Sequence, residues 1–129
     1  MAHRYALFHV AVHMLLVLAV YFVFQLNYFN FFILLLGTAV IDLDHLPLLL
    51  KKGIGGYLHL RNVRELGKPR KYFLHNFVVM PTFLISSVLA YYPQYFVFGI
   101  FSLGAASHLL WDFFEDVAVF KMGINHWKI

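Results

Sequence analysis

The sequence predicts an all-α integral membrane protein, a four-helix bundle whose helices run up-down-up-down around one basic cytoplasmic loop. The 129 residues are 62% apolar and only 12% charged, which is too apolar for an ordinary soluble domain of this length. Four apolar segments are long enough to cross a hydrocarbon core, which takes about 20 helical residues. The links "QLN" and "PQ" are so short that the helices on either side of each should be antiparallel.

The four helices are expected at about 5–24, 28–50, 72–92 and 95–120, in a single membrane domain covering 1–129. The first run is longer than the apolar region of a signal peptide, and no small-residue cleavage site closes it, so we expect it to be retained. In the second helix, Pro47 cannot bond to the Leu43 carbonyl, which predicts a break at residues 43–46. Tyrosines at several segment ends suit the water–lipid boundary.

The remaining link, at 51–71, carries most of the positive charge. Seven of the ten basic residues lie in it, and the two short turns carry none. The positive-inside rule therefore puts this loop and both termini on the cytoplasmic side of an inner or plasma membrane. The loop is a topology signal, or it binds anionic head groups or a substrate phosphate, with Arg70 and Lys71 as candidates for the phosphate. Lipid is a nearer anion than nucleic acid, for which no specific binding is expected.

Polar side chains inside the apolar segments indicate a site. Five of the six acidic residues lie there, and each costs about 2.5–3.5 kcal/mol near the membrane centre unless it is compensated. Histidines are the nearest companions. In an up-down-up-down bundle all of these residues share one depth, in the cytoplasmic half, so we interpret them as a single site. They are Asp42, Asp44, Asp112, Glu115 and Asp116 with His9, His13, His45, His75 and His108.

Helical spacing supports this interpretation. His9 and His13 are four residues apart and share a face, as do His108 and Asp112. On an ideal helix Asp44 would point away from Asp42, but irregular backbone before Pro47 could turn it inward. Glu115 and Asp116 continue the stripe of His108. They belong to the site, or they are solvated or pair with Lys121.

Imidazoles and carboxylates converging from several helices suit Zn²⁺, Mn²⁺ or Fe²⁺, and the absence of cysteine leaves only nitrogen and oxygen ligands. One or two ions are expected, a carboxylate bridging them if there are two. The candidate metal ligands are His9, His13, Asp42, Asp44, His75, His108 and Asp112, with either or both of His9 and His13 binding. The candidate catalytic or supporting residues are Asp44, His45 and Glu115.

The order of "DLDH", "LHN" and "SHLLWD" resembles the membrane-bound metal-dependent hydrolases, also described as LexA-binding, inner-membrane-associated hydrolases with a YdjM-like domain of unknown function. The elements fall on His9 or His13, on Asp42 to His45, on His75, and on His108 with Asp112. Ile41 stands where the family has proline, and Arg70 and Lys71 stand where it has His-Arg. The resemblance implies a metal site and a hydrolytic activity.

The leading functional hypothesis is a membrane-embedded hydrolase that attacks a phosphate ester of a lipid or lipid-linked substrate with metal-activated water. A metal-ion or proton-coupled transport or binding protein is the first alternative, although the polar residues crowd into one half of the bundle. A haem-binding membrane cytochrome is the second alternative, and the carboxylates beside the histidines argue against it. Membrane lipid is the expected partner, and the oligomeric state stays open.

Overall fold

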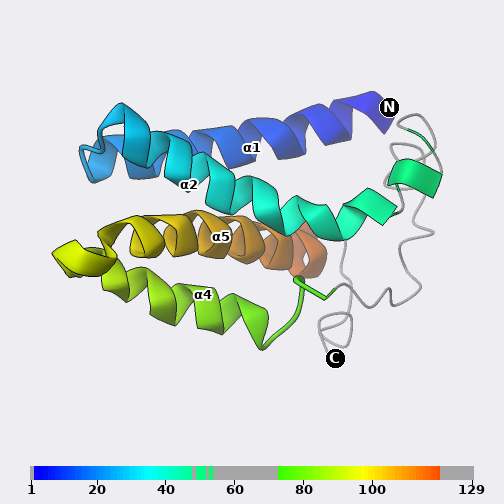
Figure 1. The fold of residues 1–129 in the computed structure, drawn as a ribbon. Helices are drawn as coiled ribbons and strands as arrows, with labels where there is room; N and C mark the ends of the chain where they lie inside the picture. The colour runs from blue at the N-terminus through cyan, green and yellow to red at the C-terminus, as the bar shows by residue number, and fades with distance from the viewer. Residues whose placement is uncertain (1, 48, 52, 54–72, 120–129) are drawn as a thin grey trace.

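The fold was taken from a computed structural model, which describes residues 2–47, 49–51, 53 and 73–119. Over this part of the chain the structure is helical and contains no strand. The elements are α1 (Ala2–Val23), α2 (Tyr28–Ile41), the 3₁₀ segment η1 (Asp42–His45), α4 (Val79–Ser87), the 3₁₀ segments η3 (Val88–Tyr91) and η4 (Pro93–Tyr95), α5 (Phe96–Phe114) and the π-helical η5 (Glu115–Val119) (Figure 1).

A tight turn joins α1 to α2. Gln25 takes a left-handed backbone conformation with φ of 48°. The side chain of Asn27 caps α2 by accepting a hydrogen bond from the Asn30 N–H at 2.8 Å, which satisfies one of the unpaired donors at the helix start. The start of α1 consequently lies at the same end of the molecule as the end of α2 (Figure 1).

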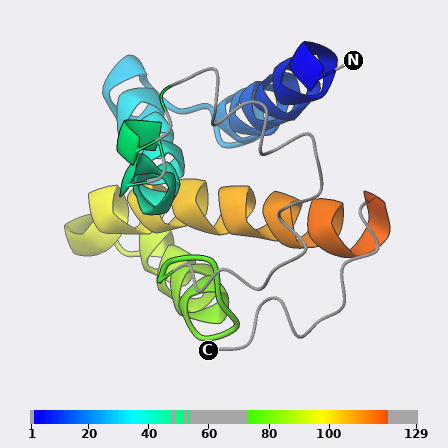
Figure 2. The same ribbon diagram turned by 90° about the vertical axis from the view of Figure 1, so that its right-hand side faces the viewer.

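Helix α5 lies at the centre, with α1 and α2 on one side and α4 on the other (Figures 1 and 2). Its closest partner is α2, because both helices have glycine where they meet. A Cβ on Gly37 would lie 2.0 Å from the Phe101 carbonyl oxygen, and one on Gly104 would lie 2.2 Å from that of Leu34. Glycine therefore sets how near the two backbones can come.

The apolar core has two parts along α5. Leu34 and Ile100 are buried in the part near the α1–α2 turn, and Ile41 and Leu109 are buried in the part nearer the polar residues. At this second end the last turns of α2 and α5 and the segment before α4 lie together (Figure 1).

The expected start of the third helix was wrong, while the irregularity expected in the second helix is present. The third helix begins at Val79 and not near residue 72, because residues 73–78 form bends and a turn. The side chain of Asn76 accepts hydrogen bonds from the N–H groups of Val78 (2.8 Å) and Val79 (2.9 Å), which fixes the helix start there. The second helix does change character before Pro47, where η1 replaces α-helical bonding.

The predicted loop at 51–71 lies outside the described residues except for Lys51 and Gly53, and so do Arg70 and Lys71. Two helical stretches are long and apolar enough to cross a membrane, Tyr28–His45 and Pro93–Ala118. The apolar helices Phe8–Val23 and Val79–Tyr91 are shorter. The all-helical class is therefore confirmed for the described residues, while four crossings and the side of the termini stay predictions.

Candidate metal centre

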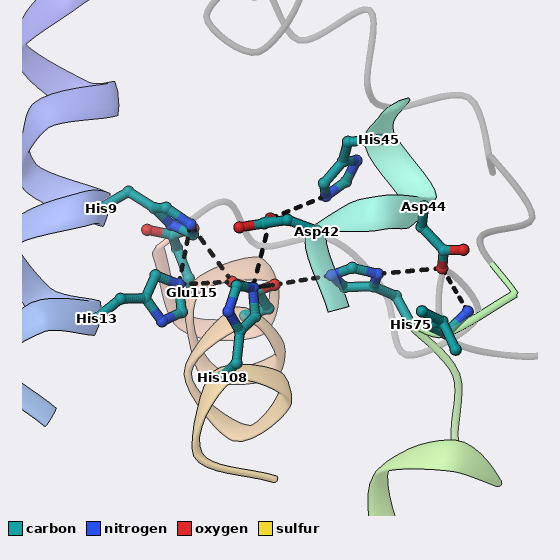
Figure 3. Close-up of polar contacts among 10 residues, drawn as sticks. His9, His13, Asp42, Asp44, His45, His75, His108 and Glu115 are labelled. Atoms are coloured by element: carbon teal, nitrogen blue, oxygen red, sulfur yellow. Dashed lines mark hydrogen bonds and ion pairs between the residues drawn. The ribbon is translucent and has the colours of Figure 1, made fainter. Parts of the chain in front are cut away.

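Four parts of the chain bring polar side chains to one end of the structure. His9 and His13 come from α1 and lie one turn apart, as their spacing predicted. The segment η1 supplies Asp42, Asp44 and His45, and the segment before α4 supplies His75. Helix α5 supplies His108 and Asp112, and Glu115 follows at the start of η5. Figure 3 shows the side chains that it labels turned toward one another.

His9, His13, His108 and Asp112 form the centre of this group. One ligand atom from each lies within 4.8 Å of all the others, and all four residues are buried. The Nε2 atoms of His9 and His13 are 2.9 Å apart, and Asp112 Oδ1 lies 3.3 Å from His13 Nε2. Three nitrogens and a carboxylate oxygen around one point are a ligand set that suits Zn²⁺ and related divalent ions.

Several of these atoms are buried without a hydrogen bond, which tests whether an ion fits. Within the described part of the chain, both ring nitrogens of His108 and the Oδ1 atom of Asp112 have no hydrogen-bond partner, and His108 is only 2% exposed. Buried polar atoms without partners are costly and call for an explanation. A cation among the four residues would accept an electron pair from one ring nitrogen of His108 and from Asp112 Oδ1, so the residues fit a metal ion.

Glu115 supports the centre from outside. Its Oε2 atom accepts a 2.8 Å hydrogen bond from Nδ1 of His9, and the two side chains are 4% and 5% exposed. This bond fixes the imidazole with Nε2 turned toward His13 and Asp112. A carboxylate on the far nitrogen of a histidine is the usual support of a metal ligand.

His75 links the centre to η1. Its Nε2 atom lies 2.9 Å from Asp112 Oδ2, and its Nδ1 atom lies 3.5 Å from Asp44 Oδ2, which also accepts a hydrogen bond from the Leu74 N–H. Burial lowers the pKa of His75, but the hydrogen bonds to Asp112 and Asp44 outweigh it and raise this pKa from 6.5 to about 9. His75 is therefore a cation at neutral pH, between two carboxylates.

Asp42 and His45 lie at the outer side of the group (Figure 3). The Asp42 side chain is 53% exposed, and its Oδ1 atom lies 3.6 Å from Nε2 of His108 and 3.9 Å from Nε2 of His45. With a side chain that is 19% exposed, His45 is less buried than His9, His13, His75 and His108. Among the described residues, this is the more exposed side of the centre.

The structure thus brings the predicted residues together as an inner group and a surrounding group. His9, His13, His108 and Asp112 form the group that could hold an ion, while Asp42, Asp44, His45, His75 and Glu115 surround it. Asn76 was not among the predicted site residues, although its side chain holds the backbone on either side of His75 through hydrogen bonds. Its position just ahead of an apolar helical run is the signal that could have found it.

Comparisons with known protein families, with curated proteins and with solved structures find no match for this chain. The likeness of its short motifs to the membrane-bound hydrolases therefore stays an expectation. The geometry of the described residues is therefore what supports a function.

Proposed function

We propose that this protein is a membrane-embedded hydrolase with a divalent metal ion at its centre, acting on a phosphate ester of a lipid or lipid-linked substrate. The observation that carries the proposal is the convergence of His9, His13, His108 and Asp112, with buried ligand atoms that lack hydrogen bonds. Zn²⁺ suits this donor set best, with Mn²⁺ and Fe²⁺ as alternatives. When bound, the ion supplies an activated water molecule and a positive charge opposite the phosphate.

The chain's own residues have separate tasks. Glu115 orients His9 through the hydrogen bond to Nδ1, and His75 orients Asp112 through Oδ2. His45 is the residue that takes a proton, because it is the most exposed imidazole of the group and a neutral imidazole can act as a general base. The exposed Asp42 beside it marks the side from which the substrate enters.

Exposed apolar side chains support a membrane setting. Large hydrophobic residues on the outside of all four α-helices are more than 40% exposed, including Leu15, Phe32, Ile85 and Phe98. Many large apolar side chains exposed on the outside of helices are typical of membrane contact. The basic sequence at 51–71 would attract an anionic head group, and in the proposed arrangement it shares the cytoplasmic side with both termini.

The test joins metal content to activity. Protein purified in detergent should contain tightly held metal, and this metal should be lost in His108→Ala and Asp112→Ala but kept in His45→Ala. Reconstituted wild type should release phosphate or a phosphorylated head group from one member of a lipid panel, and His45→Ala should not. Folded wild type without metal would refute the metal centre. Metal flux into proteoliposomes without hydrolysis would refute the hydrolase and favour transport.

A further inference from the structure

The two oxygens of Asp112 face different partners. Oδ1 lies 3.3 Å from His13 Nε2 and 3.7 Å from His9 Nε2, on the side of α1. Oδ2 lies 2.9 Å from His75 Nε2 and 3.1 Å from His108 Nε2, on the side of η1. A carboxylate with one oxygen toward each of two sets of ligands is the arrangement that bridges two metal ions, which lie about 3.5–4 Å apart in binuclear sites.

On each side of Asp112 lies a histidine whose Nδ1 is hydrogen-bonded to a carboxylate. On one side, Glu115 accepts from Nδ1 of His9 and leaves Nε2 facing the centre. On the other, Asp44 accepts from Nδ1 of His75 and leaves Nε2 facing Asp112. A carboxylate on Nδ1 with Nε2 turned inward is the usual environment of a metal-ligating histidine. This environment is therefore present twice around Asp112.

A third ligand is available on the second side. Asp42 Oδ1 lies 3.6 Å from Nε2 of His108, and the Asp42 side chain is 53% exposed. His108 is 2% exposed, and its Nε2 makes no hydrogen bond to a described residue, although it lies between Asp42 and Asp112. An ion in this position would give that buried nitrogen a partner.

We propose that the centre is binuclear, with a second divalent ion held by His75, Asp42 and Oδ2 of the bridging Asp112, and with His108 between the two positions. This inference rests on the proposed function and extends it. The two ligand atoms His75 Nε2 and Asp112 Oδ2 already lie 2.9 Å apart, on the side where the second ion would bind. The second ion is also the one nearer the exposed side, where it would meet the phosphate.

The test counts ions in the full chain. Purified protein is loaded with Zn²⁺, excess metal is removed, and metal per chain is measured by mass spectrometry. Wild type should hold two ions, His75→Ala one, and Asp112→Asn fewer than His75→Ala. The matched control is His45→Ala, which removes an imidazole whose ring centre is 5.0 Å from that of His75 and should leave both ions.

A second measurement gives its main result on wild type, so that result does not require any variant to fold. Loaded with Mn²⁺, wild type should give the electron paramagnetic resonance spectrum of an exchange-coupled pair, and His75→Ala that of an isolated ion. One uncoupled ion in wild type would overturn the binuclear site and leave the proposed metal centre standing. No ion in wild type would overturn both. Two ions in folded His75→Ala, or one in folded His45→Ala, would also overturn the second site.

Discussion

Replacement of Glu115 by glutamine tests whether the centre depends on its outer support. Gln keeps the size of the side chain and an acceptor oxygen, but it removes the negative charge that lies 2.8 Å from Nδ1 of His9. Both side chains are at most 5% exposed, so solvent screens this interaction weakly. His9 becomes a weaker electron-pair donor, because a neutral amide oxygen accepts the hydrogen bond from Nδ1 less strongly than a carboxylate does.

Loss of such a partner typically weakens metal binding by about 10- to 100-fold. This corresponds to about 1.4–2.8 kcal/mol of binding free energy. Because the Glu115–His9 pair is buried and short, we expect a value in the upper half of that range. The assay is competition for Zn²⁺ between detergent-purified protein and a chelator of known affinity.

The matched control is Asp116→Asn, which removes the same charge one residue further along η5. Its affinity for Zn²⁺ should stay close to that of wild type, which separates the hydrogen bond to His9 from the general effect of net charge. Equal affinity in wild type and Glu115→Gln, with binding abolished in His9→Ala, would refute the supporting role. Equal weakening in both charge variants would refute it as well.

Two further predictions concern stability. Hydrogen bonds to Asp112 and Asp44 raise the pKa of His75 from 6.5 to about 9. The ion pairs of His75 therefore stabilise the metal-free protein fully below pH 6.5, and this stabilisation is lost as pH rises through 9. The free energy of unfolding should fall by about 3 kcal/mol over this range. Thermal unfolding of metal-free protein across this range should show the loss in wild type and in His45→Ala but not in His75→Ala; a flat wild-type profile would contradict it. Gly104→Ala should cost about 1–3 kcal/mol because its Cβ would lie 2.2 Å from the Leu34 carbonyl oxygen. Leu110 is exposed on the same helix, so the control Leu110→Ala should change the free energy of unfolding by less than about 0.5 kcal/mol. Equal unfolding midpoints for Gly104→Ala and Leu110→Ala would refute the close α2–α5 contact.

The sequence by itself determined the features that depend on local spacing. Its apolar runs predicted the helices, and the four-residue spacing placed His9 beside His13 and His108 beside Asp112, because helical periodicity fixes which neighbours share a face. The sequence also placed Asp42 to His45 at an irregular stretch, since proline breaks helical bonding four residues back. The late start of α4 was missed because the capping bonds of Asn76 compete with the helix that the apolar pattern favours.

Only the tertiary structure decided which of these residues contact one another in the centre. Glu115 meets His9 across 106 positions of the chain, and His75 meets Asp112 across 37, so no local pattern could pair them. Those pairings follow from the position of α5 against α1, α2 and α4, which the glycine contacts with α2 help to set. Packing therefore made Asp112 the shared residue of the centre, with one oxygen toward α1 and the other toward His75.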